Sequence, residues 1–226
     1  MNRRYDVIVF DWDGTLMDSE ARIVTCMQRA AADAGVPVPD AAAARDVIGL
    51  GLREAIARLF GVGDDYVERI ANAYRAHWLG DDVEAAAMFA GAEEMLRDLH
   101  REGHLLAVAT GKSRRGLDKA LDESGLGDLF HVTRCADETF SKPHPQMLEE
   151  ILTDLNARPE YAIVVGDSEY DIQMATNAGV ASVGVTHGVH AAERLLANGA
   201  SHCFTNLDDL HRWLKEPATG LSDARG

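Results

Sequence analysis

Four short apolar runs recur along the chain, and stretches with helical periodicity separate the last three of them. The runs cover residues 5–10, 105–109, 161–165 and 181–185. Each run has the length of a buried strand, and continuous apolar runs are typical of parallel strands that are covered on both faces. This alternation predicts an α/β protein with a Rossmann-like parallel sheet as its core and helices on both faces.

The segment from residue 19 to residue 89 departs from this alternation because it contains no convincing strand. Apolar positions recur with helical spacing over residues 23–31 and 52–60, and a third helix is expected at residues 65–78. We interpret this segment as an all-helical insertion after the first strand. The predicted division is a discontinuous catalytic core at residues 1–18 and 90–216, a helical cap at residues 19–89 and a flexible tail at residues 217–226.

The charge of the chain restricts its partners. Asp and Glu number 37 against 22 Lys and Arg, which gives a net charge of −15, and an acidic chain is a poor match for nucleic acid or an anionic membrane. No apolar run approaches the roughly 20 residues of a membrane span, and the first residues lack the pattern of a signal peptide. We therefore expect a cytoplasmic monomer or homodimer with no nucleic-acid or membrane partner.

Two aspartates follow the first apolar run directly. Asp11 and Asp13 stand at the carboxyl end of the predicted first strand, which is the edge where open α/β sheets bind ligands. In extended backbone the two side chains point to the same side, and Gly14 then allows the chain to turn. Two carboxylates this close repel each other unless a cation intervenes. A hard, oxygen-seeking metal ion such as Mg²⁺ is therefore expected here.

Three later segments supply polar groups at the same predicted edge. Thr110 and Gly111 follow the second apolar run and offer a hydroxyl group and backbone N–H groups for phosphoryl oxygens. Lys142 stands just before a predicted helix, where its ammonium group can neutralise an anion. Asp167 follows the third run, and Asp171 lies one helical turn later. Together these groups predict a phosphate site with a bound cation.

The order of these segments resembles that of the haloacid dehalogenase superfamily, in the subgroup with a small helical cap, and within it the phosphoglycolate phosphatases. The resemblance covers nearly the whole chain. It implies that Asp11 attacks phosphorus and becomes an aspartyl-phosphate, and that Asp13 acts as general acid and then as general base. It also implies that Thr110, Gly111 and Lys142 bind the phosphoryl group. Mg²⁺ would be held by Asp11, the main-chain carbonyl of Asp13 and Asp167, whereas Asp171 would orient Lys142 or a metal-bound water.

Substrate specificity is expected in the cap. Arg53 lies in a glycine-rich loop between two predicted cap helices, and it is as consistent with a substrate clamp as with a cap surface residue. Arg45 is better interpreted as structural. Lys112 either steers anions toward the site or lies on a solvated helix face.

These features predict a Mg²⁺-dependent phosphatase for a small phosphorylated metabolite, with 2-phosphoglycolate as the leading substrate. A phosphosugar mutase of the β-phosphoglucomutase type keeps both aspartates and is the nearest alternative, and a pyrophosphatase is another. A phosphoacceptor signalling domain also uses Asp, Thr and Lys with Mg²⁺, but a built-in base such as Asp13 would shorten the life of its aspartyl-phosphate. Dehalogenases of the superfamily lack the second aspartate, so Asp13 argues against halide chemistry.

Overall fold

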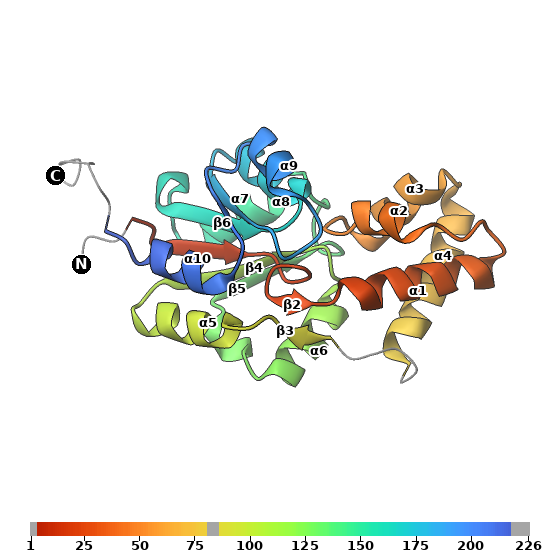
Figure 1. Cartoon of the computed structure of the whole chain (residues 1–226), viewed down its shortest axis with the longest axis horizontal. Helices are drawn as coiled ribbons and strands as arrows, with labels where there is room; N and C mark the ends of the chain where they lie inside the picture. The colour runs from red at the N-terminus through yellow and green to blue at the C-terminus, as the bar shows by residue number, and fades with distance from the viewer. Residues whose placement is uncertain (1–3, 81–85, 218–226) are drawn as a thin grey trace.

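A six-stranded parallel sheet forms the centre of the computed structural model, which describes residues 4–80 and 86–217 (Figure 1). The strand order is β5-β4-β1-β6-β7-β8. The strands are β1 Val7–Phe10, β4 Leu105–Thr110, β5 Val132–Cys135, β6 Ala162–Gly166, β7 Ala181–Val185 and β8 Cys203–Phe204. This sheet confirms the predicted α/β class. β5 and β8 were not predicted, because β5 is a mixed segment at one edge and β8 has only two residues.

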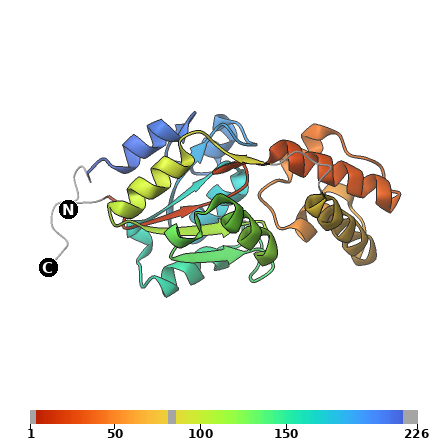
Figure 2. The ribbon, with the colours of Figure 1, turned by 90° about the horizontal axis from the view of Figure 1, so that it is seen from below.

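Helices cover both faces of the sheet (Figure 2). They are α5 Ala92–Arg101, α6 Arg114–Ser124, α7 Gln146–Asp154, α8 Glu169–Asn177, α9 Ala192–Ala197 and α10 Leu207–Leu214. β1 explains this arrangement, because all four of its residues are buried and alternate ones point to opposite faces. Ile8 and Phe10 join a hydrophobic cluster with residues of α5, α6 and α10. Val7 and Val9 join a second cluster with residues of α7 and α8.

The strand register aligns the carboxyl ends of the three central strands. Phe10 of β1 lies opposite Val108 of β4 on one side and Val165 of β6 on the other. The residues that follow β1, β4 and β6 are therefore brought to one edge of the sheet, as the sequence predicted.

Four helices, which we call the helical unit, lie beyond that edge (Figures 1 and 2). They are α1 Glu20–Ala34, α2 Ala41–Asp46, α3 Leu52–Phe60 and α4 Asp64–Leu79. The unit has a hydrophobic cluster of its own that includes Met27, Ile56 and Ile70. Since each fully buried side chain of this size contributes about 1.5–3 kcal/mol, this cluster gives the unit its own stabilising core.

A two-stranded antiparallel ribbon lies where the chain enters and leaves the helical unit. It pairs β2 Met17–Asp18 with β3 Ala87–Met88. The expectation that residues 19–89 contain no strand was therefore wrong for β3, which is too short to produce a recognisable pattern. The ribbon lies close to the predicted boundaries of the insertion.

Two further sequence predictions concern the flexible tail and a membrane-spanning helix. Residues 218–226 of the predicted tail lie outside the described residues. Across residues 4–80 and 86–217, no helix combines the length and the apolar character needed to cross a membrane.

Candidate active site

The carboxyl edge of the sheet gathers side chains from four separate segments. Asp11 follows β1, Thr110 ends β4, and Asp167 follows β6. Lys142 comes from the loop between β5 and α7, and its ammonium group reaches Asp11. All four side chains are buried, so the segments that the sequence analysis placed at one edge do meet in space.

Lys142 bridges two carboxylates. Its Nζ lies 2.7 Å from Oδ1 of Asp11 and 2.5 Å from Oδ1 of Asp171. Burial alone would lower the pKa of Lys142, but the charges of Asp11 and Asp171 raise it above its ordinary value. The lysine is therefore a permanent cation, and it donates charge-assisted hydrogen bonds to both partners.

Asp171 is held firmly from the other side. Its Oδ2 accepts hydrogen bonds from the backbone N–H and the hydroxyl of Ser168, at 3.0 and 2.6 Å. This is a capping box at the start of α8. The geometry fits a residue that orients Lys142, which is one of the two roles expected for Asp171 from the sequence; the other was to orient a metal-bound water.

Asp11 is the carboxylate with a free oxygen. It is only 2% exposed, and its buried Oδ2 has no hydrogen-bond partner. Burial raises the pKa of Asp11 to about 7, with the charges of Asp171 and Asp13 adding to the shift and Lys142 opposing it. An unpartnered oxygen on a buried carboxylate is costly unless a cation or a reacting group engages it.

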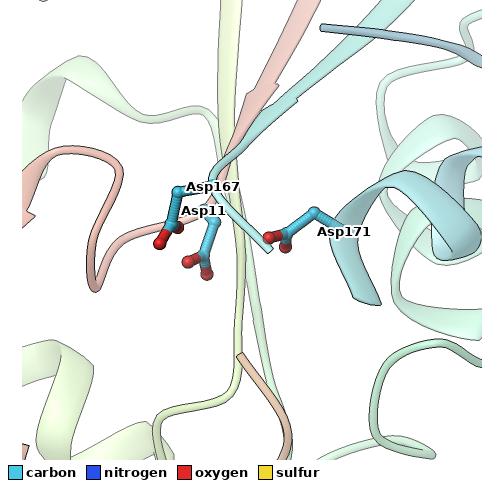
Figure 3. A group of neighbouring side chains, drawn as sticks. All are labelled: Asp11, Asp167 and Asp171. Atoms are coloured by element: carbon cyan, nitrogen blue, oxygen red, sulfur yellow. The ribbon is translucent and has the colours of Figure 1, made fainter. Parts of the chain in front are cut away.

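Asp167 completes an acidic cluster with Asp11 and Asp171. Carboxylate oxygens of these three residues lie within 4.8 Å of one another, and the side chains converge in Figure 3. Thr15 Oγ1 donates to Asp167 Oδ1 at 2.8 Å, and the backbone N–H of Val189 donates to its Oδ2 at 2.9 Å. Burial, and then the charge of Asp11, raise the pKa of Asp167 well above its ordinary value.

The donor set of this cluster fits a hard divalent cation. Each of the three residues offers carboxylate oxygen, which Mg²⁺ prefers. The cluster carries more carboxylates than Lys142 alone can neutralise, and Asp11 has an oxygen with no partner. Asp171 already uses both oxygens on Lys142 and Ser168, so Asp11 and Asp167 are the better ligands.

Asp13 faces a different set of partners from Asp11. Its Oδ1 accepts a hydrogen bond of 2.6 Å from the hydroxyl of Ser19. The ammonium group of Lys112 lies 2.9 Å from each of its two carboxylate oxygens. Asp13 is 9% exposed, and it faces the cavity described next. Ser19 was not predicted to be a site residue, and the sequence is consistent with two roles for Lys112.

A cavity of about 400 Å³ lies between the sheet edge and the helical unit. Asp11, Asp13 and Thr110 line it on the sheet side. The helical unit contributes mainly apolar and aromatic side chains to its wall, namely Ile23, Met27, Ile48, Tyr74 and Trp78. Such a cavity can enclose a small phosphomonoester and separate it from bulk water.

The loop between α2 and α3 lies against Gly111 in the wall of this cavity. A Cβ atom on Gly111 would lie 2.5 Å from the backbone oxygen of Leu50, so only glycine permits this approach. The backbone N–H of Gly51 donates to the hydroxyl of Ser141 at 2.7 Å. The helical unit is therefore in close contact with two of the four site segments.

Arg53 lines the cavity, as the sequence analysis anticipated, but its guanidinium group is paired with Glu68 of α4. Arg45 lies 2.6 Å from Glu20 in a second ion pair, which agrees with its structural interpretation. Neither pairing has a local sequence signal, because each partner lies on another helix.

Comparisons with known proteins identify the family. A family model described as haloacid dehalogenase-like hydrolase matches residues 8–185. "Probable phosphatase IndB" of Dickeya dadantii is 34% identical over 84% of this chain and 85% of its own length. "Phosphoglycolate phosphatase" of Pseudomonas putida is 28% identical over 96% of this chain and 82% of its own length. The crystal structure of a predicted phosphatase from Clostridium acetobutylicum superimposes with a TM-score of 0.85 and is 25% identical in sequence. The match covers 93% of this chain and 98% of that one. The chain belongs to the haloacid dehalogenase-like hydrolases.

Proposed function

We propose that this hydrolase is a Mg²⁺-dependent phosphatase that cleaves small phosphomonoesters through an aspartyl-phosphate on Asp11. The observation that carries the proposal is the unpartnered Oδ2 of Asp11, on a carboxylate whose other oxygen is fixed 2.7 Å from Lys142. That arrangement holds the carboxylate in one orientation and leaves one oxygen available. Asp11, Asp167 and the main-chain carbonyl of Asp13 would hold the Mg²⁺ ion, which when bound neutralises charge on the phosphoryl oxygens.

Asp11 attacks phosphorus in line, and the bond from phosphorus to the ester oxygen breaks. Asp13 gives a proton to the departing alkoxide, and a water molecule then loses a proton to Asp13 as it attacks the aspartyl-phosphate. Inorganic phosphate leaves and Asp11 is regenerated. Thr110, Gly111 and Lys142 bind the transferring phosphoryl group, and positioning with charge neutralisation supplies most of the rate enhancement.

We further propose that residues 19–89 are a cap that closes over a core of residues 1–18 and 90–216. The close approach of Leu50 to Gly111 and the bond from Gly51 to Ser141 support this division. Closure expels water from the reacting groups. The cytoplasmic location and a monomeric or dimeric state remain predictions from sequence.

The leading substrate is 2-phosphoglycolate, in line with the name of the Pseudomonas putida relative. The chief alternative is a phosphosugar mutase, which would return the phosphoryl group to a sugar instead of releasing it to water. A second alternative is a pyrophosphatase, in which the leaving group is inorganic phosphate instead of an organic alcohol. A signalling domain is disfavoured because Asp13 lies on the wall of the same cavity as Asp11, where it can activate water.

The test is a phosphate-release screen with and without Mg²⁺ over phosphoglycolate, sugar phosphates, nucleotides and pyrophosphate. We expect Mg²⁺-dependent release by the wild type, and a loss of at least about 10³-fold in the Asp11→Asn variant, as for other catalytic nucleophiles. Asp122→Asn is the matched control, because Asp122 is exposed on α6. Equal turnover by Asp11→Asn and wild type would rule out Asp11 as the nucleophile.

A further inference from the structure

Lys112 is the cation beside the proposed acid/base residue. It lies in the loop between β4 and α6, two residues after Thr110. Its Nζ is 2.9 Å from both carboxylate oxygens of Asp13, and its side chain is only 9% exposed. These contacts exclude the interpretation of Lys112 as a solvated helix residue.

Trp78 of α4 holds Lys112 from the side of the helical unit. The Lys112 ammonium group lies 4.4 Å from the centre of the Trp78 ring, within the range of a cation–π contact. Arg22 fixes Trp78 in turn, since its Nη2 donates to the Trp78 carbonyl at 2.6 Å and its guanidinium lies 4.7 Å from the ring centre. Lys112 is therefore placed on the cavity wall by one residue from the core and one from the helical unit.

The other described cations on this cavity wall are more exposed. Arg53 and Arg75 are each 48% exposed, and both face Glu68. Lys119 is 44% exposed and pairs with Glu123, and Arg115 is also exposed. Among the cavity cations in residues 4–80 and 86–217, Lys112 has the least exposed side chain, and it contacts the proposed acid/base residue Asp13.

We propose that Lys112 selects the leaving group by binding an anion, above all a carboxylate, on the carbon next to the ester oxygen. The proposal rests on the proposed function, because it requires Asp13 to meet that ester oxygen. A group that contacts Asp13 directly can reach substituents one carbon away from the same oxygen. The ammonium group has three donors, so it can keep a hydrogen bond to Asp13 while it gives another to the substrate.

The substrate class that follows is the phosphate esters of 2-hydroxycarboxylic acids, of which 2-phosphoglycolate is the smallest. The largely apolar wall of the helical unit then strengthens the ion pair, because it keeps water away from the two charges. This assignment places substrate recognition on the core residue Lys112. The cap residue Arg53 is already paired.

The test compares 2-phosphoglycolate with 2-hydroxyethyl phosphate, which replaces the carboxylate by an uncharged alcohol. We expect wild type to prefer phosphoglycolate. In Lys112→Met, kcat/KM for phosphoglycolate should fall about 10- to 100-fold, mainly through KM, which is the range of one charge-assisted hydrogen bond. The loss on 2-hydroxyethyl phosphate should be about 10-fold smaller, because that ester lacks the carboxylate and shares only the contribution that Lys112 makes through Asp13. Lys112→Arg should keep part of the preference for phosphoglycolate.

Trp78→Leu is a second variant that leaves Lys112 in place, and it should raise KM for phosphoglycolate more than for 2-hydroxyethyl phosphate. Lys215→Met is the control, because Lys215 pairs with Asp98 and Glu102, outside the residues that line the cavity.

Equal losses on both substrates in Lys112→Met would show that Lys112 acts only through Asp13 and would overturn the proposal. Wild-type turnover of other phosphomonoesters without a preference for the carboxylate would overturn it too, with the phosphatase intact. Absence of phosphate release from every ester would instead remove the proposed function itself.

Discussion

At the scale of single residues, Lys142 makes the acidic site compatible with folding. It is fully buried between Asp11 and Asp171, and a buried ion pair that loses one partner leaves uncompensated charge. We expect Lys142→Met to lower the free energy of unfolding by about 3–5 kcal/mol in the presence of EDTA, and to reduce phosphate release strongly. Urea denaturation measures the first effect. Lys119→Met, which removes a surface lysine, should change stability by less than about 0.5 kcal/mol. A Lys142→Met protein as stable as wild type would contradict this account.

The site residues divide by how their positions are determined. Asp11, Thr110 and Asp167 end or follow buried strands, so the strand pattern alone brings them together. The contacts that Ser19 and Lys112 make with Asp13 depend instead on the paths of loops, which no periodicity records.

The pairing of Arg53 with Glu68 likewise depends on how α3 packs against α4. The sequence can assign a side chain to one face of a packed helix, but it cannot identify the residue of another helix with which that side chain pairs. For this reason the substrate contact that we first expected in the cap is now proposed in the core.

At the scale of elements, the α2–α3 loop lies against Gly111 at the end of β4, and the proposed closure of the cap depends on this contact. Gly111→Ala would place a methyl group 2.5 Å from the Leu50 oxygen, so the loop must move away from the phosphate side. We expect kcat/KM to fall about 10- to 100-fold with the fold retained, since small displacements at a site cost this much. Steady-state kinetics and circular dichroism test this. The control Gly63→Ala adds a methyl group with no neighbour within 4 Å, and equal kinetics for the two variants would exclude a role for this contact.

Arg194 of α9 connects α2 of the helical unit to α8 of the core. It pairs with Asp46 and, at 2.6 Å, with Glu169, while the Tyr170 hydroxyl donates to the Asp46 carbonyl at 2.9 Å. Arg194 lowers the pKa of Asp46 and of Glu169 below their ordinary values of 3.8 and 4.5. Because these folded-state values are lowered, the stabilisation is complete above the ordinary values and is lost as the pH falls through the lowered ones.

We therefore expect Arg194→Met to be less stable than wild type by about 1 kcal/mol near neutral pH, as for a partly exposed ion-pair network. The difference should shrink steadily as the pH falls below about 4.5, because these carboxylates then begin to take up protons in the unfolded chain while they stay charged in the folded protein. Urea denaturation of both proteins across this pH range measures it. A difference that grows toward acid pH would refute the assignment of these pKa shifts. Arg158→Met serves as the control, because Arg158 is 63% exposed in a local pair with Glu160.

The elements themselves were predictable in proportion to their length and burial. β1, β4, β6 and β7 follow apolar runs and were expected, as was α4, which is one residue longer at each end than predicted. β5 carries Thr133 and Arg134 and was missed, because an edge strand tolerates polar residues. β3 and β8 have two residues each and exist through their pairing partners rather than their own pattern.

At the scale of the whole molecule, a net charge of −15 and a buried acidic cluster predict that a bound divalent cation would stabilise the fold. A ligand that binds only the folded state stabilises it by about 2.7 kcal/mol at 100 times its dissociation constant. We expect the melting temperature to rise with Mg²⁺ and to fall on addition of EDTA. The rise should disappear in Asp167→Asn but persist in the surface control Asp122→Asn. An equal rise in both variants would assign the effect to general screening of the surface charge.

The central claim is that Asp11 carries the phosphoryl group, and the Asp13→Asn variant tests it most directly, because it lacks the base that activates water. The measurement is acid quenching of this variant during turnover of p-nitrophenyl phosphate with Mg²⁺, because the nitrophenolate departs without a proton from residue 13. Mass spectrometry of the peptides follows. We predict a phosphoryl group on the peptide that contains residue 11, and none in the Asp11→Asn/Asp13→Asn double variant. A phosphorylated double variant, or a phosphoryl group on a peptide without residue 11, would contradict the account.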